Sequence, residues 1–360
     1  AADQVSHAAV SSCLTLVHGL HHCAVTTTEG LGNSRDGLHA VHARFAGFHA
    51  SQCGFCTPGM CMSLAAALAG AEGKGSGPPP REGFSRLTSA DAERAVVGNL
   101  CRCTGYRPIA DACKSFAADV DLEDLGLNSF WKKGDAHVDK LPPYKEGSIG
   151  AFPEFLKAEI IASLRVDKCM SATVMVGSES SWHRPRSVEE YYRLIASDSF
   201  DGSGTKVVAG NTSSGVYREA EVYDRYIDLR DIPELNSVSK DSEGVQIGAA
   251  TSISLVIEIL RREGDDCKDV IFGKIADHME KVSSHYVRNT ATLGGNLVMA
   301  QRDEFPSDIA TILLAAGSSV CIQVSSGKLN VTLDEFLEMP PCDYKALLLS
   351  ISVPHCTPDN

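Results

Sequence analysis

Four cysteines in two closely spaced pairs have the residue type and spacing of a metal site. The pairs are Cys53/Cys56, separated by two residues, and Cys101/Cys103, separated by one. A proline follows each pair a few residues later and precedes a helix-forming run. Proline is favoured in the first turn of a helix, where its missing N–H would be unsatisfied anyway. The pattern therefore predicts two helices whose N-termini lie beside the thiolates, where exposed N–H groups and the positive dipole end favour negative charge.

The spacing leaves the identity of the metal open. Structural zinc sites pair C-x2-C knuckles across about 12–20 residues, whereas here the gap is much longer and the second pair is tighter. A [2Fe–2S] cluster needs four thiolates, two on each iron. Cys53 and Cys56 on one iron, with Cys101 and Cys103 on the other, would satisfy that need. The spacing favours iron–sulfur, and zinc or unrelated buried cysteines are the alternatives.

The residues around both pairs resemble a known family. Residues 51–59 (SQCGFCTPG) and 98–108 (GNLCRCTGYRP) are similar to the second [2Fe–2S] domain of the xanthine dehydrogenase and aldehyde oxidase family. The resemblance implies a [2Fe–2S] cluster on the four cysteines, at one end of a pseudo-symmetric four-helix bundle.

Two further patterns independently predict helices of such a bundle. Apolar residues at Leu38, Val41, Phe45 and Phe48 recur with a period of three to four, which indicates a helix just upstream of Cys53. A capping box is indicated by Thr88 with Asp91, and Gly98 is expected to end the helix that it opens.

Composition narrows the class of protein. The chain has 360 residues, enough for two or three domains, and its hydrophobic content of 43% is ordinary for a globular protein. A net charge of −13 argues against nucleic acid as a partner. No signal peptide or membrane-spanning run is evident. Thirteen cysteines outside a small secreted scaffold favour a reducing compartment. We therefore expect a cytoplasmic protein that binds neither membrane nor nucleic acid.

The N-terminal residues are expected to be the end of a further domain. Residues 5–18 read as a short helical segment and 23–30 as a β-branched strand. In the resembling family this region ends a plant-ferredoxin-type [2Fe–2S] domain, and Cys13 matches the last of its four ligands. The other three ligands are not in this sequence, so we expect no cluster at Cys13.

Two segments read as linkers because they are rich in glycine, proline and charge. Residues 71–82 fall between the cysteine pairs, and residues 131–176 are expected to cross the surface to the next domain. The predicted domains are thus 1–33 for the ferredoxin-type remnant, 34–130 for the helical iron–sulfur domain, 131–176 for a linker and 177–357 for a flavin domain. The C-terminal subdomain of that flavin domain would lie beyond the sequence.

The last of these segments has an α+β pattern. Helices are expected at 189–196 and 254–262, strands at 206–209, 222–229 and 244–250, and further elements of the pattern at 309–316, 320–324 and 347–353. A G-x-G-x-x-G motif after a strand is missing, so an ordinary Rossmann dinucleotide site is not supported. The whole chain is predicted to be an α+β multidomain protein.

Two glycine turns in this region are candidate cofactor loops, at 210–215 and around 294–296, where a strand-edge run is expected to feed the second. A bare backbone can approach a pyrophosphate closely and aim several N–H groups at it. One such turn alone is usually only a turn, but the pair resembles the two FAD-binding loops of the xanthine dehydrogenase/aldehyde oxidase flavin domain. That domain is of the PCMH type, within the wider vanillyl-alcohol-oxidase-like fold. Residues 299–306 are longer than in xanthine dehydrogenases and look more like plant aldehyde oxidases.

The resemblance implies a set of FAD-binding residues and no catalytic residue. Asp308 matches an acidic residue that contacts the flavin, and Leu348 matches one that packs by its ring. The implied set is Lys206, Val207, Val208, Ala209, Gly210, Asn211, Thr212, Ser213, Ser214, Thr292, Leu293, Gly294, Gly295, Asn296, Asp308 and Leu348.

The resemblance also implies a function. Full-length family members are homodimers and carry a molybdopterin domain, which is outside this sequence. The chain would be the electron-transfer portion of an aldehyde oxidase-like enzyme, passing electrons from an aldehyde through [2Fe–2S] to FAD and on to O2. The alternatives are a xanthine dehydrogenase-like fragment that uses NAD and a non-catalytic remnant. The sequence leaves the substrate and the acceptor open.

Overall fold

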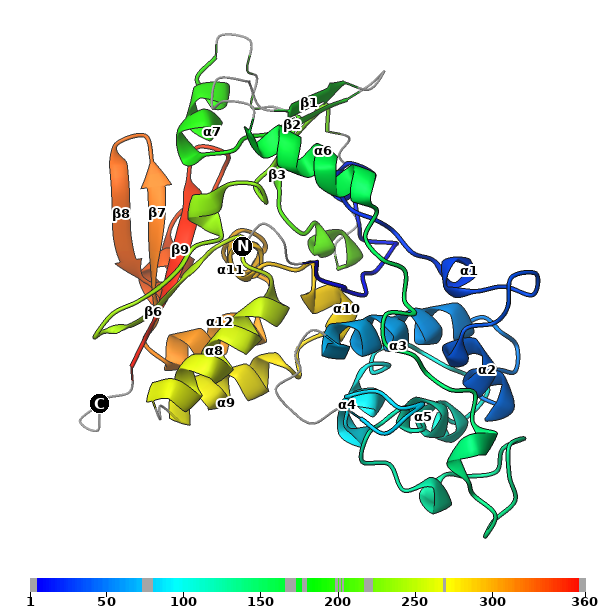
Figure 1. Cartoon of the computed structure of the whole chain (residues 1–360). Helices are drawn as coiled ribbons and strands as arrows, with labels where there is room; N and C mark the ends of the chain where they lie inside the picture. The colour runs from blue at the N-terminus through cyan, green and yellow to red at the C-terminus, as the bar shows by residue number, and fades with distance from the viewer. Residues whose placement is uncertain are drawn as a thin grey trace. The chain divides into compact units, whose positions relative to one another are not determined.

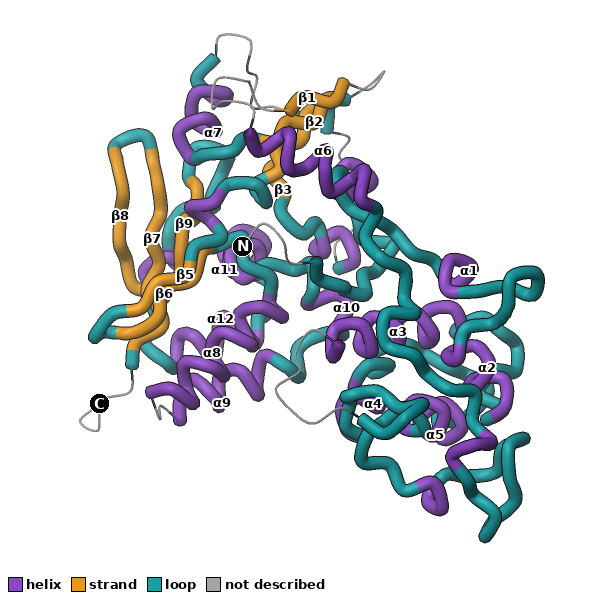
Figure 2. Tube along the Cα trace, viewed as in Figure 1, coloured by secondary structure: helices purple, strands orange, loops and turns teal. Residues whose placement is uncertain are grey.

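The computed structural model describes residues 5–72, 80–165, 173–176, 180–197, 200, 202, 204–216, 223–267 and 270–355. The chain divides into two compact units. The first consists of residues 1–9, 22–166 and 284–286, and the second of residues 10–21, 167–283 and 287–360. The named strands all belong to the second unit (Figures 1 and 2).

The first unit is helical. Its helices are α1 (Thr28–Leu31), α2 (Ala40–Gly47), α3 (Thr57–Glu72), α4 (Ser89–Arg94), α5 (Arg107–Lys114) and α6 (Glu154–Arg165). Helices α2 to α5 contribute to one hydrophobic core. The helix expected from the spacing of Leu38, Val41, Phe45 and Phe48 is α2. Val41, Phe45 and Phe48 are buried, whereas Leu38 precedes the helix and is exposed. Thr88 caps α4 as expected, because its side chain accepts a hydrogen bond from the backbone N–H of Asp91. The helix ends at Arg94, and turns continue to Gly98, which has a φ of +97°.

Residues 131–149 pack against the helices of the first unit. Trp131, Leu141, Tyr144 and Ile149 are all buried in its core. The sequence had suggested a surface crossing, because lysine, proline and glycine outnumber the apolar residues. A few large apolar side chains are enough to hold an irregular segment on a core. Residues 73–79 of the other expected linker lie outside the described residues, and residues 71–72 belong to α3.

A buried arginine joins four segments of this unit. Arg44 in α2 is 0% exposed. Its guanidinium donates hydrogen bonds to the carbonyl oxygens of Pro142 at 2.9 Å, Ser115 at 2.5 Å and Gly83 at 2.6 Å. It also lies 4.0 Å from the centroid of the Phe116 ring. An arginine has five N–H donors in a planar fork, so one side chain can satisfy several carbonyls at once.

The second unit contains two sheets. The first has the strand order β1-β2-β4-β3, formed by Thr173–Val176, Ser181–Arg184, Arg225–Asp228 and Thr205–Val208. In this sheet β1 and β2 are antiparallel, whereas β4 is parallel to both β2 and β3. Helix α7 (Val188–Ile195) follows β2, and its Tyr191 packs in a small core with Ile227 of β4.

The other sheet is antiparallel, with the order β5-β6-β9-β7-β8. Its strands are Val238–Lys240, Gly244–Gly248, Leu347–Pro354, Ser319–Val324 and Gly327–Thr332. It packs in one core with α8 (Ile253–Cys267), α9 (Val270–Met279), α11 (Leu293–Asp303), α12 (Asp308–Ala315) and α13 (Leu333–Glu338) (Figure 1). Helix α10 spans His285–Arg288. The expected strands at 206–209, 244–250, 320–324 and 347–353 are therefore found as β3, β6, β7 and β9. The expected strand at 222–229 is found in part as β4, and its first residue is outside the described ones.

Two sequence predictions about local structure were wrong. Residues 23–27 have no regular structure and 28–31 are helical, so the β-branched run at 23–30 is not a strand. The second glycine turn opens helix α11, and the run before it forms only an isolated bridge between Ser252 and Thr292. Tertiary contacts decide the state of short β-branched runs, because strand propensity is weak without a partner strand.

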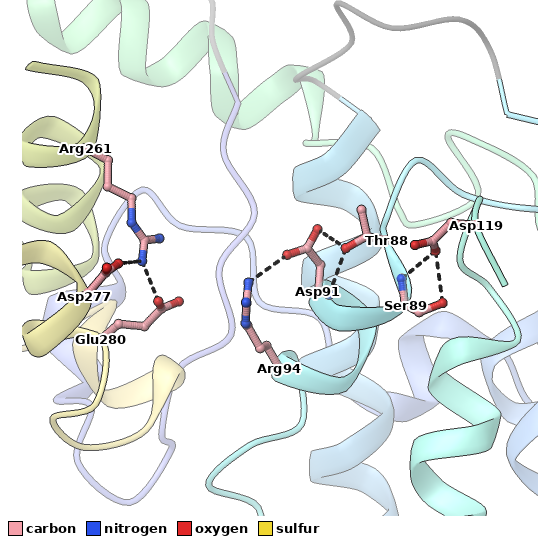
Figure 3. A network of polar contacts seen from close by, with 8 residues as sticks. All are labelled: Thr88, Ser89, Asp91, Arg94, Asp119, Arg261, Asp277 and Glu280. Atoms are coloured by element: carbon pink, nitrogen blue, oxygen red, sulfur yellow. Dashed lines mark hydrogen bonds and ion pairs between the residues drawn. The ribbon is translucent and has the colours of Figure 1, made fainter. Parts of the chain in front are cut away.

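Polar contacts at the helix surfaces support each unit separately (Figure 3). In the first unit, Asp119 accepts hydrogen bonds from both the backbone N–H and the hydroxyl of Ser89, at the start of α4. In the second unit, Arg261 of α8 forms ion pairs with Asp277 at 3.0 Å and Glu280 at 2.5 Å, and so links α8 to α9. These pairs are partly exposed, and such pairs contribute only about 0–1 kcal/mol each.

The role of Arg44 can be tested by substitution. Arg44→Met leaves the carbonyls of Pro142, Ser115 and Gly83 without their donor. We expect the free energy of opening of the first unit to fall by about 2–4 kcal/mol. Hydrogen exchange of the amides in α2 and α5 measures this quantity. Arg35→Met is the matched control, since Arg35 is exposed, and it should change the value by less than about 0.5 kcal/mol. Equal protection in the two variants would contradict a structural role for Arg44.

Candidate functional site

The two cysteine pairs lie in loops that end at the N-termini of α3 and α5. Pro58 and Pro108 occupy the first turns of these helices, as the sequence predicted. Both loops need left-handed backbone: Gly54, between the first two cysteines, has a φ of +82°, and Gly105 after the second pair has +67°. Tyr106 is also left-handed, and its hydroxyl accepts a hydrogen bond from the backbone N–H of Cys101 at 3.0 Å.

The four thiols approach one another as two pairs across the loops. Cys53 is in hydrogen-bond contact with Cys103, and Cys56 with Cys101. Both of these contacts run between the two motifs. The division in which each motif serves one iron stays a prediction, because contacts between thiols do not assign ligands to an iron. Two pairs of thiols are what a [2Fe–2S] cluster requires, with one pair on each iron.

The surroundings of the thiols shift their pKa values in opposite directions. The pKa of Cys101 is lowered to about 7, first because the hydroxyl of Thr104 lies 3.1 Å from its sulfur, and then through the backbone N–H of Thr104. The backbone N–H of Phe55 lowers the pKa of Cys53. Burial raises the pKa of Cys56 to about 11, and the hydrogen bond to Cys53 raises that of Cys103. Each contacting pair thus contains one thiol whose pKa is lowered and one whose pKa is raised.

Other cysteines of the first unit are poor ligand candidates. Cys61 and Cys113 are buried in the core, and burial raises the pKa of both thiols, to about 12 for Cys61. Cys13, in the second unit, is exposed. Within the part of the chain that the structure describes, no three or more histidine, cysteine, aspartate or glutamate side chains converge on a position for a single metal ion.

In the second unit, the first glycine turn follows β3. Asn211 is left-handed, with a φ of +57°, and opens a 3-10 turn at Thr212–Gly215. Among the described residues, the backbone N–H groups of Gly210 through Ser213 have no partner, and the buried side-chain Oδ1 of Asn211 has none either. Successive free N–H groups around a left-handed residue form an anion-binding concavity. This turn can therefore receive a diphosphate.

The second glycine turn works differently from the expectation. Its N–H groups are already used: Leu293 donates to the carbonyl of Thr251, Gly294 to that of Ala249, and Gly295 to the capping hydroxyl of Thr292. A Cβ at Gly294 would come within 2.6 Å of the Cβ of Ala249, so glycine is required there for close packing. The second turn thus supplies a surface and not the N–H donors expected from the sequence.

The two turns also touch each other. A Cβ on Gly210 would lie 2.0 Å from the carbonyl oxygen of Thr290, which is much closer than any real contact. Neither Gly210 nor Gly295 has a positive φ. The need for glycine at 210 therefore comes from the approach of the two loops and not from a left-handed backbone.

Two neighbouring cavities lie along these turns. The smaller, of about 150 Å³, is lined by residues 206–213 and by the face of α11 that carries Gly295, Val298 and Arg302. The larger, of about 500 Å³, shares residues 206–209 and Gly295 and extends to Leu348. Small-molecule sites usually measure about 300–1,000 Å³. The shared lining residues make the cavities two parts of one trough, which suits an extended dinucleotide.

The structure brings most of the sequence-predicted FAD residues to this trough. Three predicted residues do not line it. Leu293 is buried in the hydrophobic core, Ser214 binds back to the carbonyl of Asn211, and Asp308 is exposed in the first turn of α12. The neighbour of Asp308, Ser307, donates a hydrogen bond to Asn296 at 2.5 Å.

Sequence reasoning missed Arg302, which lines both cavities. It lies seven residues after Gly295 and four after Val298, on one face of α11. That spacing was visible in the sequence, but the region had been read as a strand edge and a turn. Lys206 and Arg302 are cations in the lining that can pair with a diphosphate, although Asp303 and Asp343 also line the trough and Arg302 forms an ion pair with Asp303 at 3.3 Å.

Comparisons with known proteins agree with this geometry. Residues 177–356, half of the chain, match the family described as FAD binding domain in molybdopterin dehydrogenase. The chain belongs to this family. Residues 27–114 match a second family, described as [2Fe-2S] binding domain. The helical first unit and the mixed second unit thus correspond to domains for these two cofactors.

The curated relatives of this family member include plant aldehyde oxidases. The chain is 60% identical over 363 residues to "Probable aldehyde oxidase 1" of Oryza sativa subsp. japonica, covering 98% of this chain and 26% of that protein. It is 58% identical over 356 residues to an "Indole-3-acetaldehyde oxidase" of Zea mays, with the same coverage. It is 51% identical over 361 residues to the Arabidopsis thaliana protein of that name, covering 98% and 25%. The chain therefore spans about a quarter of the length of these relatives.

Among the described helices, none has the length and apolar character needed to cross a membrane.

The cysteine site predicts one cluster per chain. Iron and acid-labile sulfide should each be about two per chain, and Cys101→Ser should abolish the visible cluster absorption, because it removes a thiol from one of the two pairs. Cys13→Ser, at an exposed cysteine of the other unit, is the control and should leave both quantities unchanged. Four irons per chain, or full cluster absorption in Cys101→Ser, would contradict this assignment.

The trough predicts a specific effect of Gly295→Val. The new side chain would meet the Thr292 hydroxyl, which a Cβ already approaches to 2.7 Å, and would enter the space that both cavities share. We expect FAD to bind about tenfold more weakly, with the cluster spectrum unchanged. Gly273→Val in α9 is the control, because a Cβ there meets no atom within 4 Å. Equal flavin content in the two folded variants would count against this turn.

Proposed function

We propose that the chain is the electron-transfer portion of an aldehyde oxidase-like enzyme, carrying a [2Fe–2S] cluster and FAD. The observation that carries the proposal is that one chain contains both a set of four cysteines in two contacting pairs and a trough with a turn that can bind an anion. Family membership supports the two cofactors. The names of the plant relatives support aldehydes as the class of substrate.

The residues have distinct roles in this proposal. When bound, the cluster carries one electron at a time, and FAD collects two and passes them to O2. Cys53, Cys56, Cys101 and Cys103 hold the cluster, and Thr104 and the loop N–H groups stabilise the thiolates. The Gly210–Ser213 N–H groups hold the diphosphate of FAD. Val207 and Leu348 supply apolar surface for its ring.

The polar side chains of the trough orient the same cofactor. The free Oδ1 of Asn211 can accept a hydrogen bond from a hydroxyl of the cofactor's sugar or ribityl chain. Lys206 and Arg302 offset the diphosphate charge. The fold of the second unit fits a PCMH-type, vanillyl-alcohol-oxidase-like flavin domain, and the location we propose is the cytoplasm. We further propose that the complete enzyme is a homodimer, as in the family that the sequence resembles.

The proposal assigns aldehyde oxidation itself to a molybdopterin domain outside this sequence. The purified chain should therefore show no oxidation of indole-3-acetaldehyde or hypoxanthine. Its visible spectrum should show both FAD and cluster absorption. After chemical reduction, the flavin absorption should return on mixing with O2 and not with NAD⁺, since the relatives are oxidases.

Each outcome of this experiment is informative. Aldehyde turnover by the pure chain would show that the active centre has been misplaced. A colourless, folded protein would favour the non-catalytic remnant. Reoxidation by NAD⁺ would favour the xanthine dehydrogenase-like alternative. The FAD and iron released from heat-denatured protein are measured. Each rate is then divided by this cofactor content.

A further inference from the structure

One wall of the larger cavity is an irregular segment between α13 and β9. This segment, residues 339–346, is called the strap below. It lines the cavity through Pro341, Cys342, Asp343, Tyr344 and Ala346. It contains two successive prolines, which have no N–H, and none of its residues is buried. A segment with so few backbone hydrogen bonds of its own depends on other elements to hold it in place.

In the first half of the strap, one side chain forms hydrogen bonds with three main-chain groups. Gln301, in α11, is 7% exposed. Its Nε2 donates to the carbonyl oxygens of Met339 at 3.2 Å and Pro340 at 2.8 Å. Its Oε1 accepts a hydrogen bond from the backbone N–H of Cys342 at 2.9 Å. Three main-chain groups of a four-residue stretch are thus bound by one buried amide.

Two tyrosines of α7 hold the other half. The hydroxyl of Tyr191 donates to the carbonyl of Tyr344 at 2.5 Å. The hydroxyl of Tyr192 lies 2.7 Å from the carbonyl of Gln323 and 3.2 Å from that of Lys345. Between α13 and β9, the strap is therefore bound by a side chain of α11 in its first half and by side chains of α7 in its second.

The chemistry at position 301 is specific. A neutral amide offers two N–H donors and one acceptor, and the strap presents two acceptors and one donor. Glutamate would lose both donors, and methionine, of similar length, would lose all three bonds. Helix α11 also carries Gly295 and Arg302, which line the trough. One helix thus holds both a lining face of the trough and the strap that forms its wall.

We propose that Gln301 is a positioning residue for the flavin cofactor: it fixes the strap against α11 and so keeps the wall of the larger cavity in place. Gln301 does not line either cavity, so it acts through the strap and not by touching the cofactor. This inference rests on the proposed function, because it takes FAD as the occupant of the trough. It adds a residue that neither the glycine turns nor the family resemblance indicated.

Limited proteolysis tests the strap without needing the cofactor. Lys345 is an exposed residue of the strap, and trypsin cleavage after it requires local opening. In Gln301→Met we expect cleavage at Lys345 to be about tenfold faster than in the wild type, with cleavage at Lys133 in the other unit unchanged. Gln246→Met, the same change on an exposed position of β6, is the control and should match the wild type. Tyr192→Phe removes the hydrogen bond to the carbonyl of Lys345 without touching either cavity and leaves that of Tyr191 in place; it should also accelerate cleavage at Lys345.

Titration with FAD completes the test. The dissociation constant of FAD should rise about tenfold in Gln301→Met and stay unchanged in Gln246→Met, and saturating FAD should slow cleavage at Lys345 in the wild type. Unchanged cleavage at Lys345 in both Gln301→Met and Tyr192→Phe would overturn the role of Gln301 in holding the strap. Faster cleavage with an unchanged dissociation constant would overturn its role in positioning the cofactor. A wild-type chain that binds no FAD, but whose variants are cleaved faster, would instead refute the proposed function.

Discussion

A buried cation bound to main-chain carbonyls is the constraint on which the helical unit depends. Removing a guanidinium from water is costly, and a carboxylate would be the usual compensation. Arg44 uses three carbonyl oxygens and an aromatic face instead. Those carbonyls belong to the loop before α4, the residue that ends α5 and the irregular segment around Pro142. Since α2 precedes the first cysteine loop and α4 and α5 flank the second, the same interaction fixes the segments that bring the two thiol pairs together.

In the flavin unit, two turns that are similar in sequence differ in whether their N–H groups already have hydrogen-bond partners. Both contain glycine and asparagine after an apolar stretch. The first leaves its N–H groups and the Asn211 Oδ1 without partners, as a binding site must. The N–H groups of the second turn already donate hydrogen bonds to the carbonyls of Thr251 and Ala249 and to the hydroxyl of Thr292, because this turn is the N-terminus of helix α11. A polar group left unpaired in a folded protein costs free energy, so the unpaired turn, and not the satisfied one, is where an anionic ligand gains most.

Much of this could be read from the sequence, and the failures have physical causes. The cysteine motifs placed two thiol pairs at helix N-termini, and the apolar spacing of Val41 and Phe45 located α2, because these signals are local. The pairing of Cys53 with Cys103 could not be read, since it depends on how two distant loops face each other. Helix α11 was missed because two glycines in its first turn hide the i, i+3, i+7 spacing of Gly295, Val298 and Arg302. Residues 131–176 read as a linker, although residues 131–149 pack on the helical core, because composition says nothing about which few side chains are buried.

In both cofactor regions, one buried polar side chain forms hydrogen bonds with the main chain of an irregular segment. Binding sites need irregular backbone, because loops can expose N–H groups and thiols that a helix or sheet would use internally. Irregular backbone in turn leaves carbonyls and N–H groups that must be satisfied where water is scarce. In the helical unit Arg44 satisfies three such groups, and in the flavin unit Gln301 satisfies three of the strap. Each is a buried side chain with several hydrogen-bonding groups in a fixed plane, which sets the direction of every bond it makes. Apolar packing alone would bury these loops without fixing their orientation, and orientation is what ligand geometry requires.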